Sequence, residues 1–144
     1  MPNRPVSQLI KNQNILTASA EISVTEAAAK MRDSRVGAIM VVEKGRLVGI
    51  FTERDALYRV LAGGKNPKQT KLGEVMTVNP TTVSASMPFG HALHLMYERN
   101  FRHVPVVEGG MPIGMVSARD ALGPEMEQFA EELKEREHIE ELLG

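Results

Sequence analysis

Apolar residues change their spacing along this chain in a fixed order, and the whole order occurs twice. The clearest parts are pairs of short runs, rich in apolar and β-branched residues, that flank four-residue turns at 38–42 with 47–51 and at 103–107 with 112–116. Runs of this kind predict β-hairpins, and glycine at positions 45 and 110 suits turn residues that need a positive φ.

A helical spacing precedes each hairpin. The apolar residues that share one helix face are Val24, Ala27, Ala28 and Met31 in the first segment and Phe89, Leu93 and Met96 in the second. A stripe at this spacing is typical of a helix that covers a core. Pro88 starts the second of these helices, where a missing N–H costs nothing.

Three further elements complete each copy. A helix is expected after each hairpin, from Thr52 and from Ser117, and the first of these ends at the glycine pair 63–64. Short helical turns and brief extended pieces precede the long helices, at 6–10 and 15–19 in one copy and at 72–76 and 81–86 in the other.

The two copies align at a constant offset of 65 residues. Residues 39–57 set over 104–122 give nine identical pairs in nineteen positions without a gap. Self-similarity on this scale indicates a duplicated structural unit. The boundaries that it predicts are 6–64 for the first repeat, 65–71 for a polar linker, 72–122 for the second repeat and 123–144 for an acidic C-terminal helix.

Each repeat, taken as short helix, strand, helix, strand, strand and helix, has a three-stranded sheet whose apolar face it cannot bury alone. Pairing the repeats about a pseudo-twofold axis buries both faces. The sequence therefore predicts an α+β fold with a C-terminal helix. Two equivalent clefts are expected between the repeats, and each is a potential ligand site.

Composition excludes several classes of protein. The chain has 144 residues and no cysteine, which removes disulfide scaffolds, thiol nucleophiles and thiolate metal sites. No apolar run approaches the roughly 18 to 20 residues of a membrane span, and residues 1–24 lack the pattern of a secretory leader. A soluble, cytoplasmic protein with no membrane partner is expected.

The net charge of −1 hides a division between body and tail. Residues 125–144 hold eight Glu against one Lys and one Arg, a net −6, so residues 1–124 carry +5. A mildly basic body fits small anions better than nucleic acid, which favours a dense basic stripe with stacking aromatics. With two Tyr, four Phe and no Trp, nucleic acid is not the expected partner.

Both repeats contain the pattern Gly-x-x-[Thr/Ser]-x-Arg-Asp, which ends at Asp55 and at Asp120. One interpretation is structural: Thr52 and Ser117 cap the helices that follow, and the acid completes a capping box. The other is functional, because a helix start, a hydroxyl and an arginine can hold phosphate, while a carboxylate can accept both hydroxyls of a ribose. The two interpretations are compatible, since a capping side chain can also contact a ligand.

These features together resemble the cystathionine β-synthase (CBS) domain in tandem. The resemblance rests on the duplicated halves, the hydrophobic-Pro-Val-Val run at 104–107, the Gly-x-x-[Thr/Ser]-x-x-Asp pattern and the LGEVMT opening at 72–77, and it covers about residues 6–122. It implies a non-enzymatic regulatory module that binds AMP, ADP, ATP or S-adenosylmethionine in its clefts. It also implies dimers that are disc-like, head-to-head or head-to-tail.

Carried over by position, the resemblance implies a set of ligand-binding residues. Ribose hydroxyls would be held by Asp55 and Asp120. Phosphate would be approached by Thr52 and Ser117, with Arg54 or Arg119 nearby. The adenine would be framed by Thr17 and Thr82 and by the strand starts Ala38, Ile39, His103, Val104 and Pro105.

The copies differ just before the second strand, where Arg102 and His103 stand in place of Gly37 and Ala38. The resemblance implies that basic residues near this point meet phosphates. The nucleotide is therefore expected in the second cleft, with Ser117, Arg119, Asp120, Arg102 and His103. The first cleft is expected to be weaker or empty.

Other signals point to no further chemistry. His91 and His94 are spaced i and i+3 on one helix, but no third ligand accompanies them, so no metal site is predicted. No motif assembles a nucleophile, a base and an oxyanion site, so no catalysis is predicted.

The tail is expected to be helical. Its apolar residues form two stripes, Met126, Phe129, Ala130 and Leu133 on one and Ile139, Leu142 and Leu143 on another. Two interpretations stay open: a terminal helix packed on its own body, or an exchanged helix that fixes a homodimer.

The sequence thus predicts a sensor that binds an adenosyl nucleotide between two repeats and transmits binding as a change of shape or assembly to an effector protein. The alternative is a ligand-free structural or protein-interaction module, in which the repeated motifs are only caps. A third possibility is direct nucleic-acid binding through the basic body.

Overall fold

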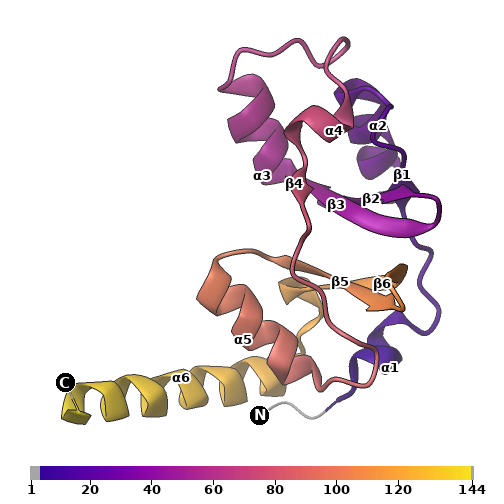
Figure 1. Cartoon of the computed structure of the whole chain (residues 1–144). Helices are drawn as coiled ribbons and strands as arrows, with labels where there is room; N and C mark the ends of the chain where they lie inside the picture. The colour runs from indigo at the N-terminus through magenta and orange to yellow at the C-terminus, as the bar shows by residue number, and fades with distance from the viewer. Residues whose placement is uncertain (1–3, 144) are drawn as a thin grey trace.

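The hairpins and long helices expected from the sequence form the framework of the computed structural model, which describes residues 4–143. Two halves are stacked one above the other, and a long C-terminal helix runs out from the lower half (Figure 1). Helices cover the outer side of each half, so the two sheets face each other across the middle of the molecule (Figure 1). The space between the repeats therefore lies between the two sheets.

A four-stranded sheet in the order β1-β2-β3-β4 spans the first half. Its strands are β1 (Thr17–Ala18), β2 (Ala38–Glu43), β3 (Arg46–Thr52) and β4 (Thr77–Val78). β1 runs parallel to β2, and the other neighbours are antiparallel. Because β4 comes from the second repeat, this sheet has one strand more than the three expected.

The second half is built on a hairpin of β5 (His103–Glu108) and β6 (Met111–Ser117). Its register repeats that of the first hairpin, with a bulge after the fourth residue of the first strand in both. The extended segment expected at 81–86 makes a single parallel bridge, Val83 with Val106. The third strand of this sheet is therefore reduced to one point of contact.

Two eleven-residue helices, α2 (Val24–Ser34) and α5 (Phe89–Arg99), cover the sheets. The expected buried faces are confirmed for every residue except Ala28, which is exposed. Each helix ends at a residue in the left-handed conformation, Arg35 after α2 and Asn100 after α5. Both of these residues stand at the edge of the space between the repeats.

Each short helix packs on the half formed mainly by the other repeat. α1 (Val6–Ile10) opens the first repeat in sequence but packs on β6, where Val6 is fully buried in the core that contains Phe89. α4 (Leu72–Val75) opens the second repeat yet supplies Leu72 to the core of the first half. Each core is therefore completed by a segment of the other repeat, which ties the halves together.

The helix expected from Thr52 is present. It begins as α3 (Glu53–Asp55) and continues as the π-helical segment η1 (Ala56–Leu61). Shortly after it, Gly64 adopts a φ of 70°, as the expected C-terminal glycine should.

The helix expected from Ser117 is wrong in length. After β6 the chain makes one 3₁₀ turn, η2 (Ala118–Asp120), and then extends at Ala121. Pro124 explains the stop, because a helix running through it would bring its ring against the carbonyl four residues earlier and leave that carbonyl without a donor.

The C-terminal helix α6 (Gly123–Leu143) packs its first half on α5. Phe129 is buried there, with its ring 4.8 Å from that of His94 in an edge-on arrangement. Its far end runs past the body and leaves Leu142 and Leu143 exposed (Figure 1). Neither α6 nor any other helix within residues 4–143 has the length and apolar character needed to cross a membrane.

Candidate functional site

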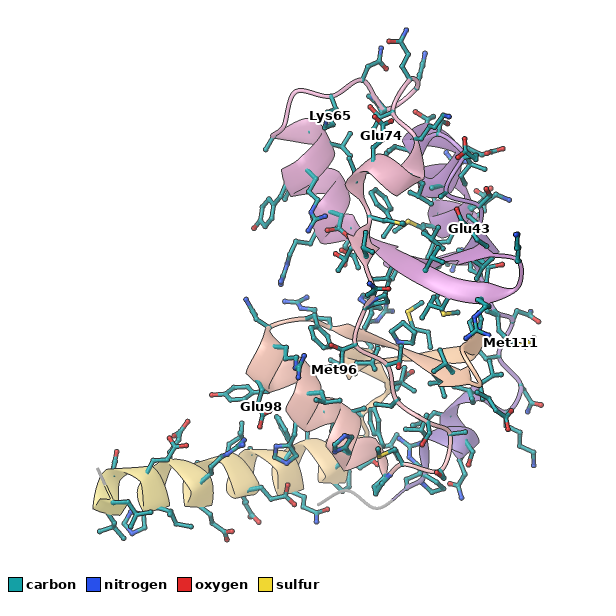
Figure 2. All side chains as sticks on the ribbon, viewed as in Figure 1. Glu43, Lys65, Glu74, Met96, Glu98 and Met111 are labelled. Carbon is teal, nitrogen blue, oxygen red and sulfur yellow. The ribbon has the colours of Figure 1, made fainter. Side chains whose placement is uncertain are left out.

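A cavity of about 690 Å³ lies between the two halves. The residues that line it come from three segments, 50–59 around the start of α3, 77–81 around β4, and 100–103 at the start of β5. Figure 2 shows nitrogen-tipped side chains of both halves reaching toward each other between α3 and α5. The cavity thus joins the Thr/Arg/Asp motif of one repeat to the strand start of the other.

Asp55 is buried beside this cavity, and its carboxylate is already engaged. Oδ2 accepts hydrogen bonds from the Thr52 N–H (2.9 Å) and the Thr52 hydroxyl (3.2 Å), and the Asp55 N–H donates to Oγ1 of Thr52 (3.2 Å). Oδ1 lies 3.4 Å from Nε of Arg59. The capping interpretation is therefore confirmed for this motif, and a ligand would share the carboxylate with the cap or replace Arg59.

Arg54 crosses from one half to the other. Its Nη1 donates to the backbone carbonyl of Asn100 at 2.8 Å. Arg102, which lines the same cavity, makes no side-chain hydrogen bond or ion pair within residues 4–143. Arg102 is therefore the guanidinium that is available to an anion here, whereas Arg54 holds the halves together.

A second cavity, of about 250 Å³, lies at the place that the duplication makes equivalent. The charged and titratable residues that line it are Arg32, Arg35, Arg102, Arg119, His103 and Glu53. Beside it, the Ser117 N–H donates to Oδ2 of Asp120 at 2.7 Å, and the second motif is also a capping box. Asp120 itself is not among the lining residues.

The two cavities share a wall made of Glu53, Arg102 and His103, which line both. Gly37 lies against this wall: a Cβ placed on it would be 3.0 Å from Oε1 of Glu53 and 3.4 Å from Cε1 of His103. The lack of a side chain at position 37 thus lets residues from the two halves meet between the cavities.

Burial lowers the pKa of His103 below its ordinary value of 6.5. Glu53 and Asp120 act in the opposite direction, and Arg102 and Arg119 add to the lowering. The imidazole is therefore neutral at pH 7, and the fixed charges of the shared wall are those of Arg102 and Glu53.

The structure gathers the expected site residues into two sets. Those that line the larger cavity are Thr52, Arg54, Asp55, Arg102 and His103, and those that line the smaller one are Ser117, Arg119, Arg102 and His103. The expected residues that line neither cavity in the described chain are Asp120, Thr17, Thr82, Ala38, Ile39, Val104 and Pro105. Ile39 and Val104 are fully buried in the two cores, so framing of an adenine there stays a prediction that calls for backbone contacts.

Sequence reasoning missed several residues of the larger cavity, among them Glu53, Tyr58 and Asn100. Tyr58 stands three residues after Asp55 on the expected helix, a spacing that places both on one side. Asn100 follows a helical pattern, where Asn is a favoured C-terminal residue. These two signals were available, but nothing in the pattern around Glu53 distinguishes it from a solvated helix residue.

One of the two histidines considered for a metal, His94, makes a contact between helices. His94 Nε2 lies 2.8 Å from Oε2 of Glu132 and joins α5 to α6. Within residues 4–143, no three side chains of metal-ligating type come together.

Comparison with known proteins gives consistent matches. The family model of the CBS domain matches residues 6–62 and 72–124. The mitochondrial CBS domain-containing protein CBSX3 of Arabidopsis thaliana is 35% identical over 124 residues, which is 83% of this chain and 60% of that protein. The chain spans between 18% and 69% of the first curated relatives that it matches.

Solved structures agree. The CBS-domain containing protein ATU1752 from Agrobacterium tumefaciens is 31% identical with a TM-score of 0.74, over 81% of this chain and 94% of that one. The CBS domain pair of protein MJ0100, in complex with 5′-methylthioadenosine and S-adenosyl-L-methionine, is 30% identical with a TM-score of 0.74, over 83% and 93%.

Proposed function

The chain belongs to the CBS domain family and carries two such domains in tandem, and from this premise we propose that it is a regulatory module that binds an adenosyl compound between its repeats. The ligand class includes AMP, ADP, ATP and S-adenosylmethionine. Binding, rather than a reaction, is the proposed activity, since both motif aspartates serve as caps at the edges of the clefts.

The larger cavity is the observation that carries the proposal. Its volume of about 690 Å³ lies within the roughly 300–1,000 Å³ of sites that enclose small ligands. Apolar and polar groups both line it, Tyr58 and Phe101 among the aromatic ones and Thr52 and Arg102 among the polar ones. This mixture suits a compound with a flat base, a diol and an anionic end.

The relative with a known ligand supports the class of compound. The domain pair of protein MJ0100, which is 30% identical to this chain, is in complex with 5′-methylthioadenosine and S-adenosyl-L-methionine. Both of those compounds contain an adenosyl group. We therefore keep the adenosyl group as the common element and leave its substituent to experiment.

We place the adenosyl compound in the larger cavity, which reverses the order of the clefts expected from the sequence. Arg102 and His103, the residues on which that order depends, line both cavities and so do not distinguish them. Volume does distinguish them. In this placement Asp55 receives the ribose hydroxyls, as the family resemblance implies, and Arg102 receives the anionic end.

Transmission would use the contact between Arg54 and the carbonyl of Asn100. This hydrogen bond joins the first repeat to the second at the rim of the cavity. A ligand that binds more tightly when the bond is made shifts the repeats toward that arrangement, and one that binds more tightly when it is broken does the reverse.

We also propose that the module is a homodimer. Three large apolar side chains of η1 are exposed, Leu57, Tyr58 and Leu61, with 50%, 62% and 73% of their surfaces accessible, and the first two also border the larger cavity. Apolar side chains gathered on one helix are typical of an association surface. The exposed end of α6 is a second candidate for the same interface.

The first test is to denature freshly purified protein and identify the released small molecules by mass spectrometry, and then to titrate AMP, ADP, ATP and S-adenosylmethionine in a thermal unfolding assay. A ligand at 100 times its Kd adds about 2.7 kcal/mol of stability. At roughly 2–4 °C per kcal/mol, this raises Tm by about 5–10 °C.

Two matched variants locate the site. Asp55→Asn and Asp120→Asn make the same change in the two motifs, and an amide oxygen can still accept the capping hydrogen bond. We expect Asp55→Asn to weaken the ligand at least tenfold and Asp120→Asn to leave it unchanged. The reverse result would restore the cleft order expected from the sequence, and the absence of any adenosyl ligand for the unmodified protein would favour the ligand-free interaction module.

A further inference from the structure

We propose that the free end of α6, residues 137–143, docks on η1 of a second copy of this chain and runs antiparallel to it. Two such contacts, related by a twofold axis, would hold the dimer together. The inference rests on the homodimer proposed above, but not on the binding of an adenosyl compound. The match to the family model ends at residue 124, so α6 lies outside what the family describes.

The free end of α6 is a helix surface without a partner. The ion pair between Arg136 and Glu98, 2.5 Å between Nη2 and Oε1, ties α6 to α5 just before this end begins. The roughly two turns beyond it carry Ile139, Leu142 and Leu143, which are 54%, 73% and 83% exposed. Figure 1 shows this end projecting past the body. The described chain therefore leaves three large apolar side chains largely uncovered here.

One face of α6 carries an acid followed by apolar residues. Glu135, Ile139 and Leu142 stand at i, i+4 and i+7, a spacing that places them on the same side of a helix. Glu135 is exposed, and its carboxylate makes no hydrogen bond or ion pair within residues 4–143. From its N-terminal to its C-terminal end, this face is first negative and then apolar.

The segment around η1 has a base after its apolar residues. Leu57 and Leu61 are exposed in η1, and the Lys65 N–H donates to the carbonyl of Val60 at 3.0 Å, which keeps Lys65 against the end of the helix. The ammonium group of Lys65 has no partner in the described chain. From residue 56 to residue 73 there are four basic residues and no acid. This surface is therefore first apolar and then positive.

An antiparallel arrangement matches the two surfaces along their length. With Lys65 beside Glu135 of the other copy, Leu61 comes opposite Ile139, and Leu57 comes opposite Leu142, because successive members of each set are three or four residues apart. The apolar side chains leave water together, and the opposite charges at one end fix the direction. A parallel arrangement would instead place both charges against apolar side chains.

Charge also disfavours the pairing of either surface with its own copy. The free end of α6 holds three Glu and no Lys or Arg, whereas η1 and the loop after it hold only bases. Two α6 ends would bring acids together, and two η1 segments would bring bases together. The contact between α6 of one copy and η1 of the other joins opposite charges, and it is the one that these observations favour.

The fold allows both contacts to form at once. In Figure 1, the helix of α3 and η1 lies on the left of the upper half, and the free end of α6 projects to the left from the lower half. A second copy that approaches from this side can therefore receive α6 and offer its own in return, as a twofold axis requires. Leu57 and Tyr58 also border the larger cavity, so a docked helix would lie next to the proposed ligand site.

The experiment uses engineered cysteines, because the chain has none of its own. The two test variants are Leu61→Cys and Ile139→Cys in the full chain. Met111→Cys is the matched control, since Met111 is as exposed as Ile139 (55% and 54%) but lies at the start of β6. The variants are co-expressed in pairs and oxidised, and covalent dimers are counted on non-reducing gels. A disulfide needs Cα atoms about 4.4–6.8 Å apart, so it reports residues that lie opposite each other.

We expect a covalent dimer when Leu61→Cys is paired with Ile139→Cys, and none for either variant alone or for any pair with Met111→Cys. A covalent dimer of Leu61→Cys alone would mean that η1 meets η1, and one of Ile139→Cys alone would mean that α6 meets α6. Either result would overturn the inference while keeping the homodimer. A monomeric mass for the unmodified protein in light scattering would refute both, without touching the proposal of adenosyl binding.

Charge exchange tests the direction of the contact without cysteines. In sedimentation equilibrium at about 0.05 M salt, where screening is weak, Glu135→Lys and Lys65→Glu should each weaken the dimer about tenfold. The two changes in one chain should restore it to within about threefold, because each contact again joins opposite charges. Glu137→Lys is the matched control, since residue 137 lies on the opposite side of α6. A double variant no better than the single ones, or an equal loss in Glu137→Lys, would overturn the inference.

Discussion

Gly49 and Gly114 are identical in the two repeats, and neither has a positive φ that would require glycine. The structure supplies a different reason for glycine at these positions. The short helices α1 and α4, each packed on the other half, bring side chains close to the two glycines. A Cβ on Gly114 would lie 2.6 Å from Cγ2 and 2.7 Å from Cβ of Ile10 in α1. A Cβ on Gly49 would meet the sulfur of Met76, next to α4, and lie 3.0 Å from the carbonyl oxygen of Thr77.

We predict that Gly114→Ala costs more stability than Gly49→Ala. Overpacking costs about 1–3 kcal/mol, and alanine returns about 0.4–1 kcal/mol by restricting the unfolded chain. Ile10 Cβ is fixed to the backbone of α1, so relief requires the helix to move, and a net loss of about 2 kcal/mol follows. Met76 is a flexible side chain that can turn away, so Gly49→Ala should lose about 1 kcal/mol or less.

Urea titration followed by circular dichroism measures both losses, and Gly49→Ala is the matched control for Gly114→Ala. Hydrogen exchange adds a local readout, because the Val6 N–H donates to the carbonyl of Met87 at 2.9 Å and its protection should fall when α1 is displaced. The reasoning would be refuted if Gly114→Ala were as stable as the unmodified protein, or if Gly49→Ala were the more harmful change.

Three further predictions concern the charged wall and the outer helices. Arg35→Asn should raise stability by roughly 1 kcal/mol, or about 3 °C in Tm, by relieving the left-handed backbone, and an unchanged or lower Tm would contradict this. Burial lowers the pKa of His103, so on acidification the unfolded chain takes up this proton before the folded protein does. The free energy of unfolding should therefore be unaffected by this group above pH 6.5 and decrease as the pH falls below it. Urea titration from about pH 7.5 to 5 should show a smaller decrease for His103→Gln. Leu61→Glu should convert a dimer into a monomer in light scattering, because it places a charge on the exposed side of η1, and an unchanged mass would move the interface to α6.

Much of the fold could be predicted because the information is local and duplicated. The hairpins follow from apolar runs flanking glycine-containing turns, and both appear with the same register and the same bulge. The buried faces of α2 and α5 follow from a helical spacing of apolar residues, which fails only at Ala28. Detection of the repeat then reduced the possible topologies to one pair of related halves.

The exchange of the short helices could not be predicted in the same way. The apolar residues of α1 and α4 show that each helix has a face to bury, but a periodic pattern does not say which core receives it. The length of η2 was open to prediction, because Pro124 stands where a helix from Ser117 would have to continue.

For the candidate site too, the features within one element could be predicted, whereas those assembled from several elements could not. The motifs at Thr52 and Ser117 are visible because both copies keep them, and their capping boxes are present. Glu53 was missed because its importance depends on lining the same two cavities as His103, a residue of the other half that stands fifty positions later in the sequence. Sequence patterns report what lies along one element, whereas a wall between two cavities is assembled from several.

Duplication gives this chain two equivalent clefts, and a few unequal positions make them chemically different. At the offset of 65, the pairs beside the cavities that differ in charge include Arg35 with Asn100, Gly37 with Arg102, and Glu53 with Ala118. An arginine therefore ends the helix beside the smaller cavity where an amide ends the one beside the larger. Since Arg102 borders both cavities, an anion that engages it from one side reduces what it offers to the other, and such coupling is reciprocal by thermodynamic necessity. A duplicated fold can in this way respond to the ratio of two ligands rather than to the amount of one.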